Sequence, residues 1–88
     1  MKERELERMF KALGNRRRLL ILSFLKKKKR ANVGEISEAI KLSFKSTSRH
    51  LGVLASAEIL DKEQTSLYVN YSLPDIKSDI LKKILEAL

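Results

Sequence analysis

Residues 32–60 decide the fold, and they read NVGEISEAIKLSFKSTSRHLGVLASAEIL. Asn32 and Glu35 have the spacing of a capping box, in which each side chain bonds the backbone amide of the other residue. A helix is therefore expected to begin at Asn32, and its apolar positions recur at helical spacing, at Val33, Ile36 and Ile40. Lys41 and Leu42 form a short turn that brings a second helix close to the first.

The second helix of this stretch is expected to run from Phe44 to about Ser56. Ser43 precedes it and is a favoured N-cap, because a short side-chain oxygen accepts a bond from a free amide of the first turn. Two short helices joined by a tight turn have the layout of a helix-turn-helix, whose second helix enters the major groove of DNA.

A helical wheel gives the second helix two different sides. The side expected to face inward is small or apolar and comprises Phe44, Thr47, Ser48, Leu51, Leu54 and Ala55. The outward side is basic and hydroxylated and comprises Lys45, Ser46, Arg49, Gly52 and Val53, with His50 at the border. Lysine and arginine match the acceptors on guanine, serine makes short contacts, and glycine leaves room for close approach. An ordinary amphipathic helix with a solvated face would show the same pattern.

This side of the helix supplies the candidate DNA contacts. We expect Lys45, Ser46 and Arg49 to meet base edges or adjacent phosphates. Ser43 is expected to contact phosphate, because free amides at a helix N-terminus favour an anion. The border position of His50 favours packing or phosphate contact over base reading. Lys62, which follows the motif, is a further candidate.

Two helices are expected before the motif. Residues 2–13 carry one apolar stripe, formed by Leu6, Met9, Phe10 and Leu13. Gly14 and Asn15 then suit the end of this helix and the beginning of the next. Residues 16–29 are apolar on nearly every side in their middle, which indicates the buried centre of a small fold. The arginines at 16–18 do not suit the positive end of that helix dipole, and either DNA backbone contact or a solvated helix end accounts for them.

After Leu60 the pattern changes to the alternation typical of strands. Residues 60–64 and 67–73 are expected to form a hairpin, whose alternating positions are Leu67, Val69, Tyr71 and Leu73. Pro74 ends it, and a last helix is expected from Asp75 to Leu88. Four helices, a hairpin and a final helix make a mostly α fold with a small β-hairpin (α+β). This is a winged helix-turn-helix, with the helix-turn-helix at residues 32–56 and the wing at residues 60–73.

Composition narrows the classes of protein. The 88 residues, 43% hydrophobic and 34% charged, indicate one folded domain over residues 1–88. The formal net charge of +8 favours double-stranded DNA as a partner, although solubility alone also explains a basic protein. No membrane partner and a cytoplasmic location are expected, because no apolar run reaches roughly 20 residues and the charged start lacks a signal-peptide core. The scarcity of Gln, Asn and Cys hints at a thermophilic archaeal or bacterial source.

Five segments carry a family resemblance. They are FKALGNRRRLLIL at 10–22, GEI at 34–36 with Ala39 and Ile40, Leu42 with Ser43, SRHLGVL at 48–54, and YSL at 71–73. The string SRHLGVL is the most specific of them. Together they resemble the ArsR-type family of bacterial and archaeal winged-helix repressors, and the resemblance implies a transcriptional regulator that binds DNA.

The resemblance also implies a homodimer formed through the first and last helices, residues 1–13 and 75–88. The residues agree, because these helices carry more large apolar side chains than one small core covers. The candidates are Leu6, Met9, Phe10, Leu13, Ile76, Ile80, Leu81, Ile84, Leu85 and Leu88. Two-fold symmetry would place two recognition helices about one DNA turn apart, facing a palindromic operator. A monomer that folds its last helix back is the alternative.

The sequence departs from the family at the metal sites. Asn32 and Gly34 stand where metal-sensing members carry cysteines, and the chain has no Cys. The last helix offers only the acidic residues Asp75, Asp79 and Glu86, without His. We therefore expect no metal site and no cofactor.

Two further departures lie after the recognition helix. Glu58 replaces the glycine that normally follows it, and a left-handed turn there would cost about 1 kcal/mol. The short wing carries Asp61 and Glu63 with only Lys62, so its contact with DNA is an open question.

The residues leave two functions in competition. The favoured one is a DNA-binding regulator, a repressor without a metal switch. The alternative is a winged-helix protein-interaction or assembly module without sequence-specific DNA binding, which the acidic wing favours. An enzyme is not expected, because the chain has no Cys, one His and no glycine-rich phosphate loop. Whether a small-molecule effector exists is left open.

Overall fold

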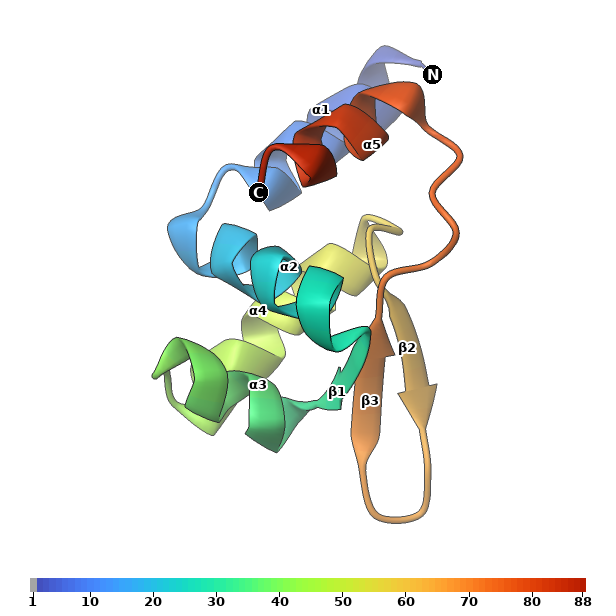
Figure 1. Cartoon of the computed structure of the whole chain (residues 1–88). Helices are drawn as coiled ribbons and strands as arrows, with labels where there is room; N and C mark the ends of the chain where they lie inside the picture. Colours follow the sequence, from blue (N-terminus) through green and yellow to red (C-terminus); the bar gives the residue numbers. More distant parts are fainter. Residues whose placement is uncertain (1) are drawn as a thin grey trace.

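A computed structural model describes residues 2–88 as five helices and a three-stranded sheet (Figure 1). The order is α1 (Glu3–Leu13), α2 (Arg16–Lys28), β1 (Arg30–Asn32), α3 (Val33–Ile40), α4 (Phe44–Ser56), β2 (Asp61–Gln64), β3 (Val69–Ser72) and α5 (Asp79–Glu86). The winged helix-turn-helix expected from the sequence is confirmed. In the part described, no helix has the length and apolar character needed to cross a membrane.

The predicted caps set the starts of α2 and α3. Asn32 Oδ1 accepts a bond from the amide of Glu35 at 2.8 Å, and Glu35 Oε1 accepts one from the amide of Asn32 at 2.9 Å. Asn15 likewise accepts bonds from the amides of Arg17 and Arg18. These bonds satisfy amides that have no partner within the helix, so local sequence determines where both helices begin.

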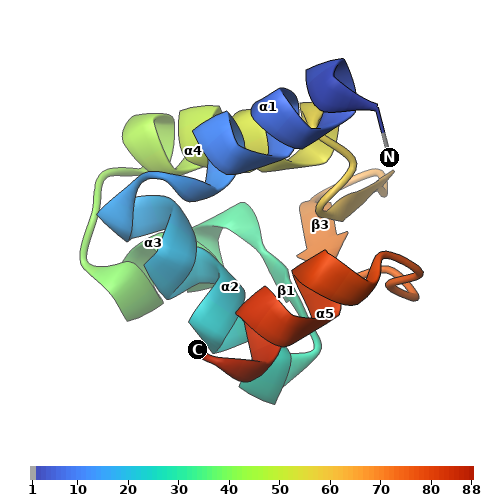
Figure 2. The same ribbon diagram turned by 90° about the horizontal axis from the view of Figure 1, so that it is seen from above.

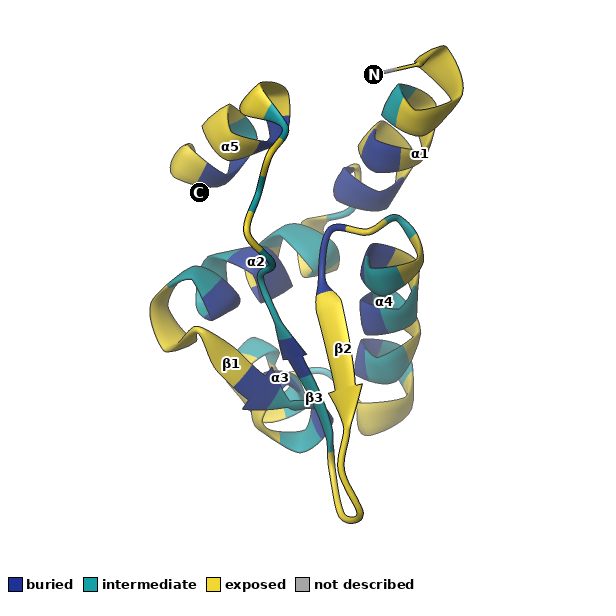
Figure 3. Cartoon of the chain, turned by 90° about the vertical axis from the view of Figure 1, so that its right-hand side faces the viewer, coloured by how far each residue is buried: buried dark blue, intermediate teal, exposed yellow. Residues whose placement is uncertain are grey.

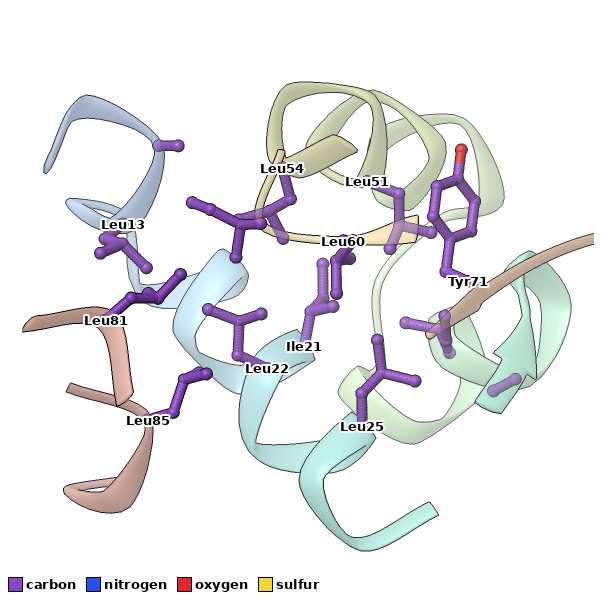
Figure 4. Close-up of a cluster of buried hydrophobic side chains, with 14 of the residues drawn as sticks. Leu13, Ile21, Leu22, Leu25, Leu51, Leu54, Leu60, Tyr71, Leu81 and Leu85 are labelled. Carbon is purple, nitrogen blue, oxygen red and sulfur yellow. The ribbon is translucent and has the colours of Figure 1, made fainter. Parts of the chain in front are cut away.

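The helix α2 is the buried centre of the molecule. Ile21, Leu22 and Leu25 have no exposed surface, and they pack with the equally buried Leu51 and Leu54 of α4 (Figure 4). Burying one such side chain stabilises a fold by roughly 1.5–3 kcal/mol. The same contacts therefore hold the fold together and fix α4 in position.

The sheet contains a strand that the sequence pattern did not reveal. β1 pairs antiparallel with one edge of β3 and β2 with the other, so that Ala31 and Lys62 both lie opposite Tyr71. A three-residue strand is too short to show alternation, and its partner lies about 40 residues away. Through β1 the hairpin is bonded to the helical part of the molecule. Leu67, expected within the second strand, precedes β3 and is 81% exposed in the turn.

The last helix begins later than expected. Ser78 is its N-cap, since the hydroxyl accepts a bond from the amide of Leu81 at 3.3 Å, and α5 starts at Asp79. Among residues 2–88, Asp75 makes no such bond, so the prediction of a helix from Asp75 was wrong. Ile76 consequently lies on the connection between β3 and α5 rather than on a helix.

The helices occupy one end and two flanks of the molecule. α1 and α5 lie at the end of the molecule opposite the hairpin turn (Figures 1 and 3). Figures 2 and 3 both place α1 on the same flank as α4, and α5 on the other flank. α1 accordingly contacts α4, while α5 contacts α2. The end of the chain after α5 is also bonded to α2, because Lys26 Nζ donates to the carbonyl of Leu88 at 2.8 Å.

Candidate nucleic-acid interface

The turn of the helix-turn-helix spans residues 41–43. Lys41 adopts the left-handed conformation at φ 56°, and the amide of Leu42 bonds the carbonyl of Ser37 at 3.0 Å, which closes α3. Ser43 then caps α4, because its Oγ accepts a bond from the amide of Ser46 at 3.1 Å. The side-chain oxygen of Ser43 is thus engaged in the cap, at the end of α4 where free amides favour an anion.

The outward side of α4 is basic and open. Lys45 and Arg49 are exposed and lie one turn apart, and their side chains form no hydrogen bond or ion pair within residues 2–88. Ser46 is half-buried between them. At Gly52 a side-chain carbon would meet no atom within 4 Å, so nothing obstructs approach to the helix there. The side predicted by the wheel is present, and its contact with DNA stays a prediction.

Phe44 is exposed, contrary to the prediction. It was expected to face inward, yet it is 61% exposed, whereas Thr47 and Leu51 on the same wheel sector are fully buried. Phe44 is the first residue of α4, and this turn extends beyond the core. A wheel gives the direction of a side chain around the axis, but it does not show where along the axis the helix leaves its neighbours. The exposed ring therefore adds apolar surface beside Lys45.

His50 is held by an arginine from α2. Arg18 Nη1 lies 3.1 Å from His50 Nδ1. The same guanidinium donates to the carbonyls of Ala12, at 2.6 Å, and Lys11, at 3.2 Å. These carbonyls end α1, where the helix dipole favours a cation. Arg18 therefore joins three helices, which explains an arginine at the unfavourable end of α2 and favours packing over base reading for His50.

The surroundings of His50 favour its neutral form. Burial lowers the pKa of His50 below its ordinary value, and the positive charges of Arg18, Arg17 and Arg49 lower that pKa further. A neutral imidazole accepts the bond from Arg18 at Nδ1, whereas a protonated ring has no acceptor. Protonation would therefore break this hydrogen bond between α2 and α4.

The wing presents little positive charge. β2 is exposed along its whole length, and Glu63 forms an ion pair with Arg30 (Figure 3). Lys62 is exposed, but it lies opposite Tyr71 in the ladder, before the turn at residues 65–68. The turn itself is uncharged and exposes Leu67 and Tyr68. DNA contact by Lys62 stays a prediction that rests on a single side chain.

The residues predicted for a dimer interface fall into two groups. Met9, Leu13, Leu81 and Leu85 are buried in the core of this chain and hold α1 and α5 to α2. Leu6, Phe10, Ile76, Ile80, Ile84 and Leu88 are half-buried or exposed. Phe10, Ile80 and Leu88 are the large apolar members with most exposed surface. Only the second group is available to a partner.

The acidic residues near the last helix are spread apart. Asp75 precedes α5, and Asp79 and Glu86 are its first and last residues. Seven residues along a helix span about 10 Å, which is too far for two carboxylates to bind one ion. Within residues 2–88, no group of three or more His, Cys, Asp or Glu is placed to hold a metal ion.

Sequence reasoning missed a second set of cations beside α4. Arg4, Arg8 and Lys11 follow the spacing i, i+4, i+7, so they lie on one side of α1. With Arg18 and Arg49 they line a groove between α1 and α4, which we call the α1–α4 groove. The spacing was visible in the sequence, but α1 was interpreted only through its apolar stripe.

Known proteins resemble this chain in sequence and in structure. The family model described as "Bacterial regulatory protein, arsR family" matches residues 15–62, which include α2, the helix-turn-helix and the start of the wing. Reduced HlyU from Vibrio cholerae is 31% identical and superimposes with a TM-score of 0.78, covering 96% of this chain and 84% of that chain. Among curated protein sequences there is no significant match.

Two more distant structures share the fold. The DNA-binding domain of Mb0332 from Mycobacterium bovis, described as a homodimeric winged helix-turn-helix, is 23% identical with a TM-score of 0.77, covering 94% of this chain and 73% of that chain. The transcriptional repressor PagR of Bacillus anthracis is 24% identical with a TM-score of 0.78, covering 96% and 92%. The family match and the likeness to HlyU show that this chain belongs to the ArsR family of winged helix-turn-helix transcription regulators.

Proposed function

We propose that the chain is a repressor that binds a palindromic operator as a homodimer, without a metal switch. The observation that carries the proposal is the outward side of α4, where Lys45 and Arg49 are exposed and unpaired within residues 2–88 and Gly52 leaves the helix open. In a helix-turn-helix this side faces the major groove.

The contacts follow from the chemistry of each side chain. Arg49 has the forked donors that match N7 and O6 of guanine, and Lys45 reaches base edges or phosphates. Ser46 and the amides at the start of α4, which Ser43 caps, favour phosphate oxygens. His50 supports these residues by packing, because its ring is already bonded to Arg18.

Dimerisation is supported by apolar surface at the end formed by α1 and α5. Phe10 is 47% exposed, Ile80 41% and Leu88 37%. Exposed apolar side chains gathered at one end of a small protein usually mark an interface. The homodimeric state described for Mb0332 and the repressor activity described for PagR support the same reading for this chain. A two-fold axis at this end would place the two wings at the far ends of the dimer.

The proposal is tested by selecting bound sequences from random duplex DNA while the mass of the protein in solution is recorded. We expect a two-fold symmetric consensus, with half-sites about 10 bp apart, and a mass of two chains. A single asymmetric half-site with a monomeric mass would contradict the dimer, and the absence of any enriched sequence would contradict operator binding.

The wing supports a second candidate, a protein-interaction module. Its turn exposes Leu67 and Tyr68, and its strands carry Asp61 and Glu63 against Lys62. A module of this kind would bind DNA weakly and with little dependence on salt, whereas phosphate contacts make affinity fall steeply as salt rises. A binding titration across salt concentrations therefore separates the two functions.

A further inference from the structure

The α1–α4 groove carries a concentration of positive charge. Its basic residues are Arg4, Arg8 and Lys11 of α1, Arg18 of α2 and Arg49 of α4, and Glu7 is its one carboxylate. Four of these five cations lie outside the recognition helix. The groove therefore shares Arg49 and Gly52 with the proposed base-reading side and extends that basic surface onto α1.

Some of these charges are occupied and others are free. Glu7 lies 3.8 Å from Lys11, and both side chains are largely exposed. Arg18 donates to two carbonyls and faces His50. Arg4, Arg8 and Arg49 have no hydrogen-bond or ion-pair partner for their side chains within residues 2–88. Because Arg49 is assigned to base reading, Arg4 and Arg8 are the two guanidinium groups that remain available to an anion.

Some of the residues that line the groove are small where the two helices approach each other. Ala12 comes from α1, Gly52 from α4 and Ala57 from the C-terminal end of α4. A side-chain carbon at Gly52 would meet no atom within 4 Å, so this part of the groove is open space. A phosphate group can therefore approach α4 at Gly52 without displacing a side chain.

The groove also lies on the flank that DNA would cover. α1 and α4 share that flank, and α5 lies on the other one (Figures 2 and 3). In the proposed dimer the two-fold axis lies near the end formed by α1 and α5. The operator would then pass from α4 of one protomer, along both copies of α1, to α4 of the other.

We propose that the α1–α4 groove binds the phosphodiester backbone of the operator between the two half-sites, with Arg4 and Arg8 neutralising phosphates. This inference rests on the proposed function, and it adds to it a contact that carries no sequence information. Contacts of this kind raise affinity for all sequences equally and steepen the dependence of affinity on salt.

The test compares two variants that lose the same charge. In Arg4→Gln/Arg8→Gln the change lies in the groove. In the control Lys27→Gln/Lys28→Gln it lies in the exposed last turn of α2, on the flank away from α1 and α4 (Figure 2). Affinity is measured from low to physiological salt for the selected duplex and for a scrambled duplex, and thermal unfolding of each variant is recorded.

Two lost phosphate contacts per protomer make four per dimer, so the slope of log affinity against log salt should fall by about 3 to 4 in the groove variant. Its affinity should fall by a similar factor on both duplexes, leaving their ratio unchanged. The control should keep the slope of the unmodified protein, and so should Arg4→Lys/Arg8→Lys, which retains the charges.

The proposal is overturned if the groove variant and the control have equal slopes, or if only the selected duplex loses affinity. Failure of the proposed function looks different, because the unmodified protein would then show neither a preferred duplex nor a steep slope. In that event the inference falls with the function.

Discussion

The recognition helix α4 and the wing are adjacent in the chain, but they differ in charge and in how firmly the core holds them. α4 is capped by Ser43 and anchored by Leu51 and Leu54, which have no exposed surface, and its outward side is basic. β2 is exposed along its whole length and carries Asp61 and Glu63. Base reading requires side chains held in a fixed geometry, whereas backbone contact tolerates flexibility. We therefore expect α4 to contribute more to DNA affinity than the wing.

The largest effect should come from removing the arginine of α4. Arg49→Ala is expected to weaken binding to the selected duplex by about 1–3 kcal/mol, because a bidentate contact with guanine is worth that much. Lys62→Ala in the wing should cost less than about 1 kcal/mol, since Lys62 is the only cation of β2. Anisotropy titrations of both variants at one salt concentration measure the two effects. A loss of affinity for Lys62→Ala as large as that for Arg49→Ala would show that the wing contributes as much to binding as α4.

The next largest effect is expected at the turn between α4 and the wing. Glu58 has φ 62°, a left-handed conformation that costs a residue with a side chain about 1 kcal/mol. Glu58→Gly is expected to raise the free energy of unfolding by up to about 1 kcal/mol, and Glu58→Ala, which keeps the penalty, should leave it nearly unchanged. Urea unfolding curves distinguish them. Equal stability of the two variants would show that this turn is not strained.

Phe44 tests whether the first turn of α4 reads bases. An exposed phenylalanine at this position can contact the methyl group of thymine. If it does, Phe44→Ala should cost about 0.8 kcal/mol on the selected duplex, the worth of one buried methyl or methylene group. On a duplex with deoxyuridine in place of thymine in the half-sites, the substitution should cost almost nothing. An equal loss of affinity on both duplexes would show that Phe44 does not contact the thymine methyl group.

The smallest effect concerns the hydrogen bond between Arg18 of α2 and His50 of α4. Because burial and the neighbouring arginines lower the pKa of folded His50 below its ordinary value of 6.5, the unfolded chain takes up the proton first. The stabilisation is therefore complete above pH 6.5 and is lost as pH falls through the lowered pKa of the folded state. Urea unfolding at pH 7.5, 6 and 5 should show this loss, and His50→Gln should show less of it. Identical pH dependence in the two proteins would contradict the role given to His50.

Local interactions explain what was predictable from the sequence. The capping box of Asn32 and Glu35 depends on residues three positions apart, and the structure confirms it. The left-handed conformation of Glu58 was raised only by the resemblance, in which a glycine normally stands at this position. The late start of α5 shows the limit of this reasoning, because two potential caps, Asp75 and Ser78, lie close together and only one makes its bond.

The features that were missed depend on distant partners. β1 exists because β3 pairs with it, and Arg18 finds His50 across 32 positions of sequence. The exposure of Phe44 depends on where α4 leaves the core. The cations of the α1–α4 groove were visible as a spacing, but their position beside α4 follows from the packing of α1.

In the proposed complex, two copies of α4 read one operator from a fixed separation. This geometry is tested most directly by inserting about 5 bp between the half-sites of the selected duplex, which turns one half-site to the opposite face of the DNA. We predict that affinity falls to that of a duplex with one intact half-site, because a dimer joined through α1 and α5 cannot reach both faces. Unchanged affinity after the insertion would contradict the proposed geometry.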